Sequence, residues 1–307
     1  MSLRDEMLDA ASSARDMLQD CADLVVEFLR GRISLDGGFR GRSDTSDLYY
    51  TVFGLDALAA LDAEPPGEAT RRYLDGFADG EGLDLVHLAC LARCRAALAE
   101  PPDPVMTRRC FERMQAYAAP GGGYSHMAAG GRCTAYGCFL AVGACEDLQL
   151  DSPQMEEVAA ALAGLRCDDG SYANEVAVRK GSVPATAAVV TLLRHLQRRR
   201  EFEAERWLLS QVRPAGGFAA GPWAPAPDLL STATALHALV GNDAFPEERR
   251  EDCLNFLDSL WSSRGGFHGH WGDEELDTEF IFYGLLALGC LSRTNRDTPA
   301  VALERRQ

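Results

Sequence analysis

The chain has 307 residues, of which 47% are hydrophobic, and its formal net charge at pH 7 is −16. This length and hydrophobic content support one large domain or two ordinary ones, with a substantial buried core. A strongly acidic chain has the wrong sign for neutralising phosphates or anionic lipids, so nucleic acid is not expected as a partner. No run of about 18 apolar residues occurs, and no membrane span is predicted.

The N-terminal stretch MSLRDEMLDAASSARDML is charged and amphipathic, and it lacks the apolar core of a signal peptide. It predicts a first long helix over about 3–29. The ten cysteines form no CxxC pair and lie mostly in apolar contexts, which favours reduced thiols in the core. We therefore expect a soluble, cytoplasmic protein.

A turn with glycines and an aromatic residue recurs along the chain. Its five copies are LDGGFRG (35–41), PGGGYSH (120–126), DDGSYAN (168–174), PAGGFAA (214–220) and RGGFHGH (264–270). The aromatic residues, which are Phe39, Tyr124, Tyr172, Phe218 and Phe267, are 85, 48, 46 and 49 residues apart. The first gap is nearly two periods, so a degenerate unit is expected near 79–94. The period predicts six repeats.

After each turn comes a short polar link and then an apolar, small-residue-rich segment, as in YYTVFGLDALAAL and EFIFYGLLALG. Such segments are typical of helices buried on all sides. The segments between them, such as PQMEEVAAALAGLRC, are charged on one face and predict outer helices. The sequence therefore predicts an all-α (α/α)6 toroid of two concentric rings over residues 1–292, in which the first helix packs near the last inner helix, and a tail over 293–307.

The glycine-aromatic turn, the link that ends in Asp, Thr or Ser, and the apolar inner helix resemble the repeats of protein prenyltransferase β subunits and of squalene–hopene-type terpene cyclases. The resemblance spans about 37–289. It implies a ring of inner helices around a funnel of aromatic and apolar side chains that holds an isoprenoid chain.

Protein prenyltransferases of this group bind catalytic zinc with an Asp and a Cys at the start of one inner helix and a His at the start of the next. The resemblance places Asp228 on the aspartate, Leu230 on the cysteine and Phe280 on the histidine. Because a lone carboxylate does not hold catalytic zinc, no metal or other cofactor is expected. The link GPWAPAPD before Asp228 also lacks the basic residues for a diphosphate; Arg132, Arg179 and Lys180 lie in neighbouring links.

The cyclases use a DxDD motif followed by Thr-Ala, whose middle Asp protonates an alkene when it is held protonated in a dry site. The best match is DLLSTA at 228–233, which keeps the first Asp and the Thr-Ala but has Leu230 and Ser231 in place of the acid pair. The chain thus resembles both groups in framework and departs from both at the chemical centre.

Asp228, Asp47 and Glu279 are the candidate proton donors. Asp228 and Asp277 each precede an inner helix, where an N-cap is the simplest role for an Asp. Asp47 shares its link with Ser43, Thr45 and Ser46, which could cap the helix and leave that carboxylate to face the cavity.

Aromatic residues on links and inner helices are candidates for the funnel wall, where cation–π contacts would stabilise a carbocation, although such residues also fill ordinary cores. The candidates for substrate binding are Trp223, Phe280, Tyr283, Tyr136, Tyr50, Trp271, Arg179 and Lys180, with Tyr49 and Phe282 as further aromatic candidates. His268 and His270 with Glu279 form an alternative metal ligand set, against the simpler interpretation of a loop and a solvated acidic run.

The sequence leads to two main hypotheses and does not decide whether the protein is an enzyme. The first is a prenyltransferase-like transferase or terpene cyclase-like enzyme that acts on an isoprenoid, without catalytic zinc. The second is a non-catalytic toroid that binds a lipid or a partner protein, such as a helical subunit or a second copy of the chain. A glycosidase-like (α/α)6 enzyme, which would need two opposed carboxylates, is a third.

Overall fold

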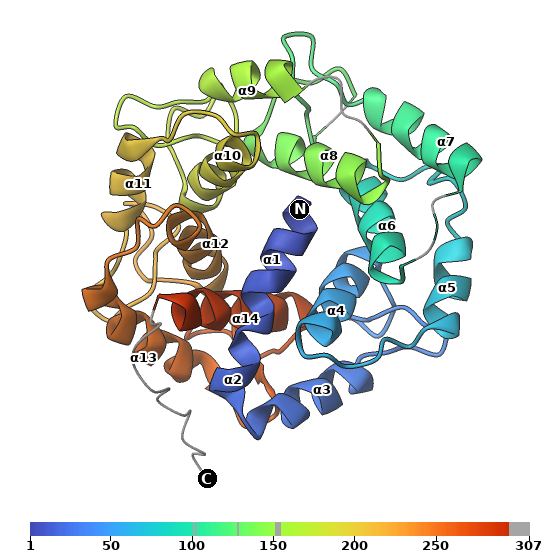
Figure 1. Cartoon of the computed structure of the whole chain (residues 1–307), viewed down its shortest axis with the longest axis horizontal. Helices are drawn as coiled ribbons and strands as arrows, with labels where there is room; N and C mark the ends of the chain where they lie inside the picture. Colours follow the sequence, from blue (N-terminus) through green and yellow to red (C-terminus); the bar gives the residue numbers. More distant parts are fainter. Residues whose placement is uncertain (100, 102, 128, 151–154, 295–307) are drawn as a thin grey trace.

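The computed structural model describes residues 1–99, 101, 103–127, 129–150 and 155–294. Six inner helices form a closed ring in which each contacts its two neighbours, and the last contacts the first. They are α4 (Leu48–Ala60), α6 (Leu85–Ala97), α8 (Ala135–Asp147), α10 (Val183–His195), α12 (Leu229–Val240) and α14 (Thr278–Arg293). Figure 1 shows this ring inside an outer one, which confirms the predicted toroid.

The outer helices alternate with the inner ones along the chain. They are α3 (Cys21–Gly31), α5 (Glu68–Asp75), α7 (Pro104–Gln115), α9 (Met155–Ala163), α11 (Phe202–Leu209) and α13 (Arg250–Leu260), the last preceded by the short 3₁₀ turn η1 (Glu247–Arg249). The degenerate unit expected near 79–94 contains the start of α6. Among the described helices, none combines the length and apolarity needed to cross a bilayer. Of the expected tail, residues 295–307 lie outside the described part of the chain.

Every inner helix begins at a polar residue with extended backbone whose side chain accepts a hydrogen bond from a backbone N–H of the first turn. The caps are Asp47, Asp84, Thr134, Ser182, Asp228 and Asp277. Such caps satisfy donors that have no partner within the helix. The expected capping roles of Asp228 and Asp277 are confirmed.

The aromatic residue of each turn is anchored in the core. Phe39, Phe218 and Phe267 are fully buried, and the ring of Phe267 lies against Gly284 of α14, where a Cβ atom would be 2.2 Å from it. The N–H groups of Phe39 and Phe218 donate to the hydroxyl groups of Thr51 and Thr232, each at 2.9 Å. In the last turn the aromatic residue belongs to a two-stranded ribbon, β1 (Trp261–Ser262) with β2 (Gly266–Phe267). These contacts fix each turn to the inner helix that follows it.

Glycines of the same turns allow close approach to the next outer helix. Gly216 has φ 80°, and a Cβ atom there would lie 1.8 Å from the carbonyl oxygen of Asp252 in α13. Gly265 of the last turn has φ 87°, and its Cβ atom would lie 2.3 Å from the carbonyl oxygen of Leu24 in α3. Only glycine fits a left-handed conformation at such short range. Because α3 is the first outer helix, the last turn closes the ring.

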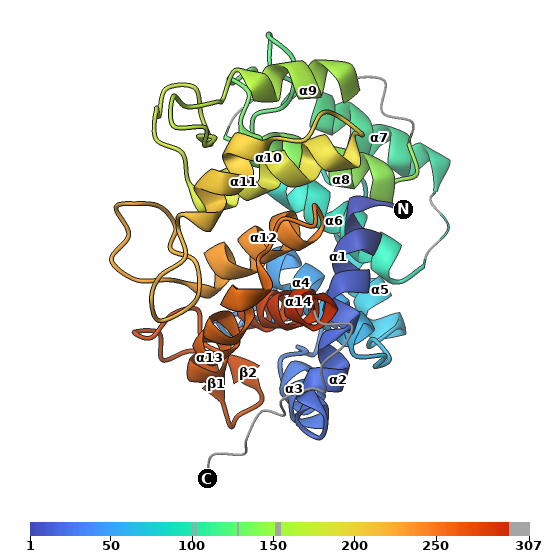
Figure 2. The same cartoon turned by 60° about the vertical axis from the view of Figure 1, so that its left-hand side comes forward.

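The prediction of one long helix over 3–29 is wrong, because this segment forms α1 (Leu3–Ser12), α2 (Ala14–Leu18) and α3. The chain turns at Gln19, which has φ 48°. This break lets α1 enter the ring while α3 joins the outer layer. The predicted packing of the first segment near the last inner helix is confirmed, since α1 and α2 both contact α14. Figures 1 and 2 show α1 in the middle of the ring, at the end opposite to the long links.

Ion pairs hold α1 against the carboxyl-terminal halves of the inner helices. Arg4 pairs with the buried Asp56 at 2.9 Å, and Asp56 also pairs with Arg93 at 2.6 Å. Glu6 pairs with Arg194 and lies 3.1 Å from His237. Buried charges are stable only when they are paired in this way, so the network fixes the position of α1.

We expect Gly265→Ala to destabilise the fold by about 3 kcal/mol or more. A left-handed Ala costs about 1–2 kcal/mol, and its Cβ atom would also overlap the backbone of α3. The matched control is Gly82→Ala, because Gly82 has φ 81° and no atom lies within 4 Å of the place that its Cβ atom would take. Denaturant titration should show a clearly larger loss for Gly265→Ala; equal losses would contradict the close-approach argument.

Glu6→Gln should destabilise the protein at neutral pH by roughly 2–3 kcal/mol. Burial works to raise the pKa of Glu6, but His237 and Arg194 outweigh it and lower this pKa from 4.5 to about 2. The stabilisation is therefore complete above about pH 4.5 and lost as the pH falls towards 2. Unfolding measured between pH 2 and 7 should show the variant losing less stability on acidification than the wild type.

The control for this variant is Asp62→Asn, which removes the exposed ion pair with Arg15. Such a pair contributes about 0–1 kcal/mol. An equal effect of the two substitutions would contradict the anchoring role of Glu6.

Candidate functional site

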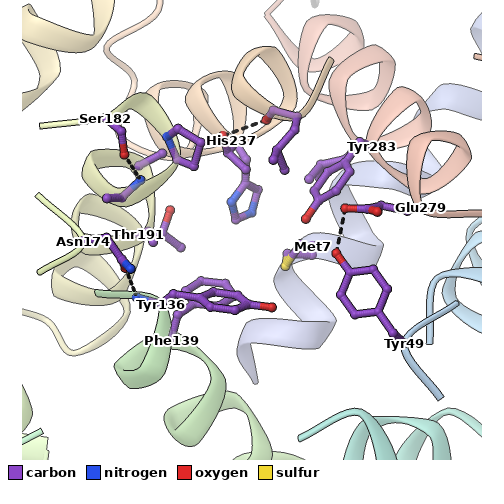
Figure 3. A pocket seen from close by; sticks show the side chains of 17 residues that line it. Met7, Tyr49, Tyr136, Phe139, Asn174, Ser182, Thr191, His237, Glu279 and Tyr283 are labelled. Carbon is purple, nitrogen blue, oxygen red and sulfur yellow. Dashed lines mark hydrogen bonds between the residues drawn. The ribbon is translucent and has the colours of Figure 1, made fainter. Parts of the chain in front are cut away.

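The inner ring encloses a cavity of about 380 Å³ whose wall is mostly apolar. This volume lies within the range of about 300–1,000 Å³ typical of ligand pockets. Figure 3 shows side chains from α1 and the inner helices pointing into it. The lining residues are Met7, Tyr49, Tyr136, Phe139, Asn174, Ser182, Pro184, Ala185, Ala187, Ala188, Thr191, Leu230, Thr234, His237, Glu279, Tyr283 and Leu286.

The six caps place the lining residues in layers. The second residue after a cap lies near the links, and five of these residues line the cavity: Tyr49, Tyr136, Pro184, Leu230 and Glu279. The ninth residue after a cap lies deeper, next to α1, and this layer comprises Asp56, Arg93, Gly143, Thr191, His237 and Leu286. With a rise of 1.5 Å per residue, the two layers are about 10 Å apart. We call them the mouth layer and the floor layer.

Glu279 is the one carboxylate that lines the cavity within the described chain. It follows the cap Asp277 on α14, and its Oε1 atom accepts a hydrogen bond of 2.7 Å from the Tyr49 hydroxyl group of α4. Burial raises the pKa of Glu279 above its ordinary value, although the bond from Tyr49 works to lower it. A carboxyl group in this setting can be held protonated and can give up its proton to a ligand.

Aromatic rings form the wall between the two layers. The rings of Tyr49 and Phe53 are 5.0 Å apart, and those of Phe53 and Tyr283 are 5.5 Å apart. Tyr136 and Phe139 extend this wall on α8. Burial raises the pKa of Tyr49, Tyr136 and Tyr283, so these phenols remain neutral. Their ring faces can stabilise a positive charge on a ligand in this cavity.

The floor of the cavity is built partly from α1. Met7 contributes its side chain there, beside His237 of α12 and Thr191 of α10 (Figure 3). A further cavity of about 90 Å³ shares Met7, Tyr49 and Tyr283 with the main one and reaches Arg4 and Arg93. The N-terminal helix therefore limits how deeply a ligand can enter.

The other two predicted proton donors lie outside the cavity. Both Asp228 oxygens are bound by Ser231, one by its N–H at 2.7 Å and the other by its hydroxyl group at 2.8 Å. Asp47 caps α4 through the N–H of Tyr49, and its side chain is 43% exposed. The three predicted acids are thus not brought together, and only Glu279 reaches the ligand space.

Of the predicted substrate-binding residues, Tyr136 and Tyr283 line the cavity. Phe280 instead packs under Arg42 and against Gly269, and Tyr50 lies against Gly41. These two side chains leave their helices on the side that faces a link. They therefore support the links and do not reach the ligand space.

The remaining predicted binding residues lie on exposed links. Trp223 and Trp271 are 51% and 52% exposed. Arg179 and Lys180 are exposed too, with the Lys180 ammonium group 5.8 Å from the centre of the Trp223 ring. They belong to the surface around the links and do not line the cavity.

The residues at the expected zinc positions do not fit a metal site. Both carboxylate oxygens of Asp228 accept hydrogen bonds from Ser231. Leu230 forms part of the apolar cavity wall, and Phe280 packs against a link. The three residues of the alternative metal ligand set do not lie together either. His270 is exposed, His268 borders a separate surface pocket and Glu279 lines the cavity. Across the described residues, no three His, Cys, Asp or Glu side chains come together as a metal site. All ten cysteines, which lie in the described part, are free thiols.

Sequence reasoning missed Met7, Phe139, Thr191 and His237. The signal for Thr191 and His237 is their equal distance from the caps Ser182 and Asp228, which would have placed both in the floor layer. Phe139 lies one turn below Tyr136 on the same face. Met7 carries no such signal, because α1 does not belong to the repeat.

The variant of the type II terpene cyclase MstE from Scytonema in complex with geranylgeranyl dihydroxybenzoate is 13% identical, with a TM-score of 0.63, and the match covers 95% of this chain and 98% of that one. The Candida albicans protein geranylgeranyltransferase-I complexed with GGPP is 12% identical, with a TM-score of 0.64 over 88% and 90% of the two chains. The two TM-scores show that this chain shares its fold with both proteins.

An inactive variant of an alpha-1,6-mannanase of Salegentibacter sp. in complex with alpha-1,6-mannotriose is 13% identical, with a TM-score of 0.59 over 90% of this chain and 99% of that one. A search of curated proteins found no match. Residues 13–179 and 185–303 match the sequence profile described as the prenyltransferase alpha-alpha toroid domain. The chain belongs to the prenyltransferase alpha-alpha toroid domain family.

Proposed function

We propose that the protein binds a linear isoprenoid chain in the central cavity and cyclises it by proton transfer from Glu279. The proposal rests on the buried carboxyl group of Glu279 at the mouth of an aromatic, largely apolar cavity. The two similar proteins bound to geranylgeranyl compounds support the substrate class. The missing zinc ligands favour acid catalysis over prenyl transfer.

The first step is protonation of a terminal carbon–carbon double bond. The π electron pair of the alkene takes the Glu279 proton and forms a C–H bond, which leaves a carbocation on the neighbouring carbon. The π pair of the next double bond then closes the ring. The Tyr49 hydroxyl group, 2.7 Å from Oε1, stabilises the carboxylate that Glu279 becomes.

The cation moves from the mouth layer towards the floor as rings form. Tyr136, Phe139 and Tyr283 present aromatic rings along this path. Cation–π contacts in a desolvated site contribute about 2 kcal/mol each, and they grow with the charge of the transition state. The wall therefore favours cation formation and keeps bulk water away.

Glu279→Gln should reduce turnover of all-trans-geranylgeraniol by a factor of about 100 or more, because general acids contribute about 10²–10⁴ to the rate. Binding of the same compound, followed by native mass spectrometry, should persist, since the amide has the same shape. Asp47→Asn is the matched control, and it should retain turnover because Asn also caps a helix.

Turnover unaffected by Glu279→Gln would contradict the role of Glu279 as the proton donor. Binding of geranylgeraniol without turnover by the wild type would instead favour a non-catalytic toroid that carries a lipid. Absence of both binding and turnover would contradict the isoprenoid assignment itself.

The pH dependence of turnover should respond to Tyr49. Turnover needs the protonated Glu279 and should fall as the pH rises through its pKa. Because the Tyr49 hydrogen bond works to lower that pKa, Tyr49→Phe should move the falling limb of the profile to higher pH. Tyr50→Phe, a neighbour outside the cavity, should leave the profile unchanged; a shift in both variants would contradict a specific Tyr49–Glu279 bond.

A further inference from the structure

Protonation of the substrate starts the cyclisation, and a further step must remove the carbocation that remains when the rings have formed. The final carbocation either loses a proton to a base, which gives an alkene, or captures water, which gives an alcohol. Within the described structure, the floor layer contributes an imidazole to the cavity wall, that of His237. A role for this imidazole in the last step rests on the proposed function.

His237 is placed at the far end of the cavity from the acid. It is the ninth residue after the cap of α12, whereas Glu279 is the second residue after the cap of α14. This difference puts the two groups about 10 Å apart along the ring axis. His237 is only 6% exposed, and its side chain points into the cavity near Met7 (Figure 3).

The α1 helix supplies a partner that suits His237 to proton uptake. Its Nε2 atom lies 3.1 Å from Oε1 of Glu6, which is an ion-pair distance, although the two atoms do not have the geometry of a hydrogen bond. Among the described residues no group hydrogen-bonds Nδ1, which leaves that lone pair for a ligand. Burial opposes ionisation of Glu6, but its contacts with His237 and Arg194 lower its pKa to about 2, so the carboxylate keeps its charge. A carboxylate beside one imidazole nitrogen stabilises the imidazolium formed when the other takes a proton.

We propose that His237, positioned by Glu6 of α1, is the base that ends the reaction. Its Nδ1 lone pair takes a proton from the carbon next to the cationic centre, and the electron pair of that C–H bond becomes the new double bond. His237 touches the substrate and is a catalytic residue, whereas Glu6 acts through it as a positioning residue. The N-terminal helix is then part of the active site as well as of the fold.

The alternative is that His237 has only a structural role and holds α1 in place through Glu6. The chain offers a matched comparison in His195, which pairs with Glu146 at 2.5 Å at the same end of the ring. Glu146 also accepts a hydrogen bond of 2.8 Å from the N–H of Leu3, so this second pair holds α1 too. His195 does not line the cavity.

The test follows the products formed from all-trans-geranylgeraniol by the wild type, His237→Gln, Glu6→Gln and His195→Gln, with melting temperatures recorded for each. Gln at position 237 is polar and similar in size to His but has no basic nitrogen. We expect the ratio of cyclic alkene to cyclic alcohol to fall at least tenfold in His237→Gln. Glu6→Gln should shift the ratio in the same direction by less, and His195→Gln should not shift it.

An unchanged product ratio in folded His237→Gln would overturn the proposal, as would an equal shift in His195→Gln. Where His237→Gln does not fold, an unchanged ratio in Glu6→Gln overturns it equally. Failure of the proposed function would look different, because the wild type itself would then leave geranylgeraniol unconverted.

Discussion

The architecture depends on the close contact between each glycine turn and the next outer helix. At Gly216 and Gly265 the backbone comes so near to the neighbouring carbonyl group that no side chain fits. The aromatic residue two positions further on is buried against the inner helix that follows. Each turn thus ties the outer helix of the next repeat to the inner ring, and the last of these contacts joins the end of the toroid to its beginning.

Closure gives the cavity its layers. Because every inner helix starts at a polar cap at the same end of the ring, equal distances from the caps become equal depths. One acid near the caps and one imidazole near α1 therefore face a single apolar space from opposite ends. The interior between them is aromatic and neutral, which suits a hydrocarbon that carries charge only during a reaction.

The sequence predicts the repeat well because glycine turns, caps and buried helices each leave a local pattern. It predicts the site less well. Phe280 and Glu279 are neighbours on α14, yet only one of them faces the cavity, and this depends on the rotation of the helix within the closed ring. Trp223 and Trp271 are aromatic, which made them candidates for the cavity wall, but both lie on exposed links. The position of α1 depends on ion pairs between residues far apart in sequence, such as Glu6 and Arg194, which no local pattern reveals.

A crystal structure of the protein with bound geranylgeraniol would test most directly whether the inner ring holds the isoprenoid. We expect the isoprenoid chain to lie inside the inner ring, with a double bond beside the Glu279 carboxyl group and the hydrocarbon reaching the floor formed by Met7 and His237. A ligand bound on the outer surface, or a cavity that stays closed at saturating ligand, would contradict it.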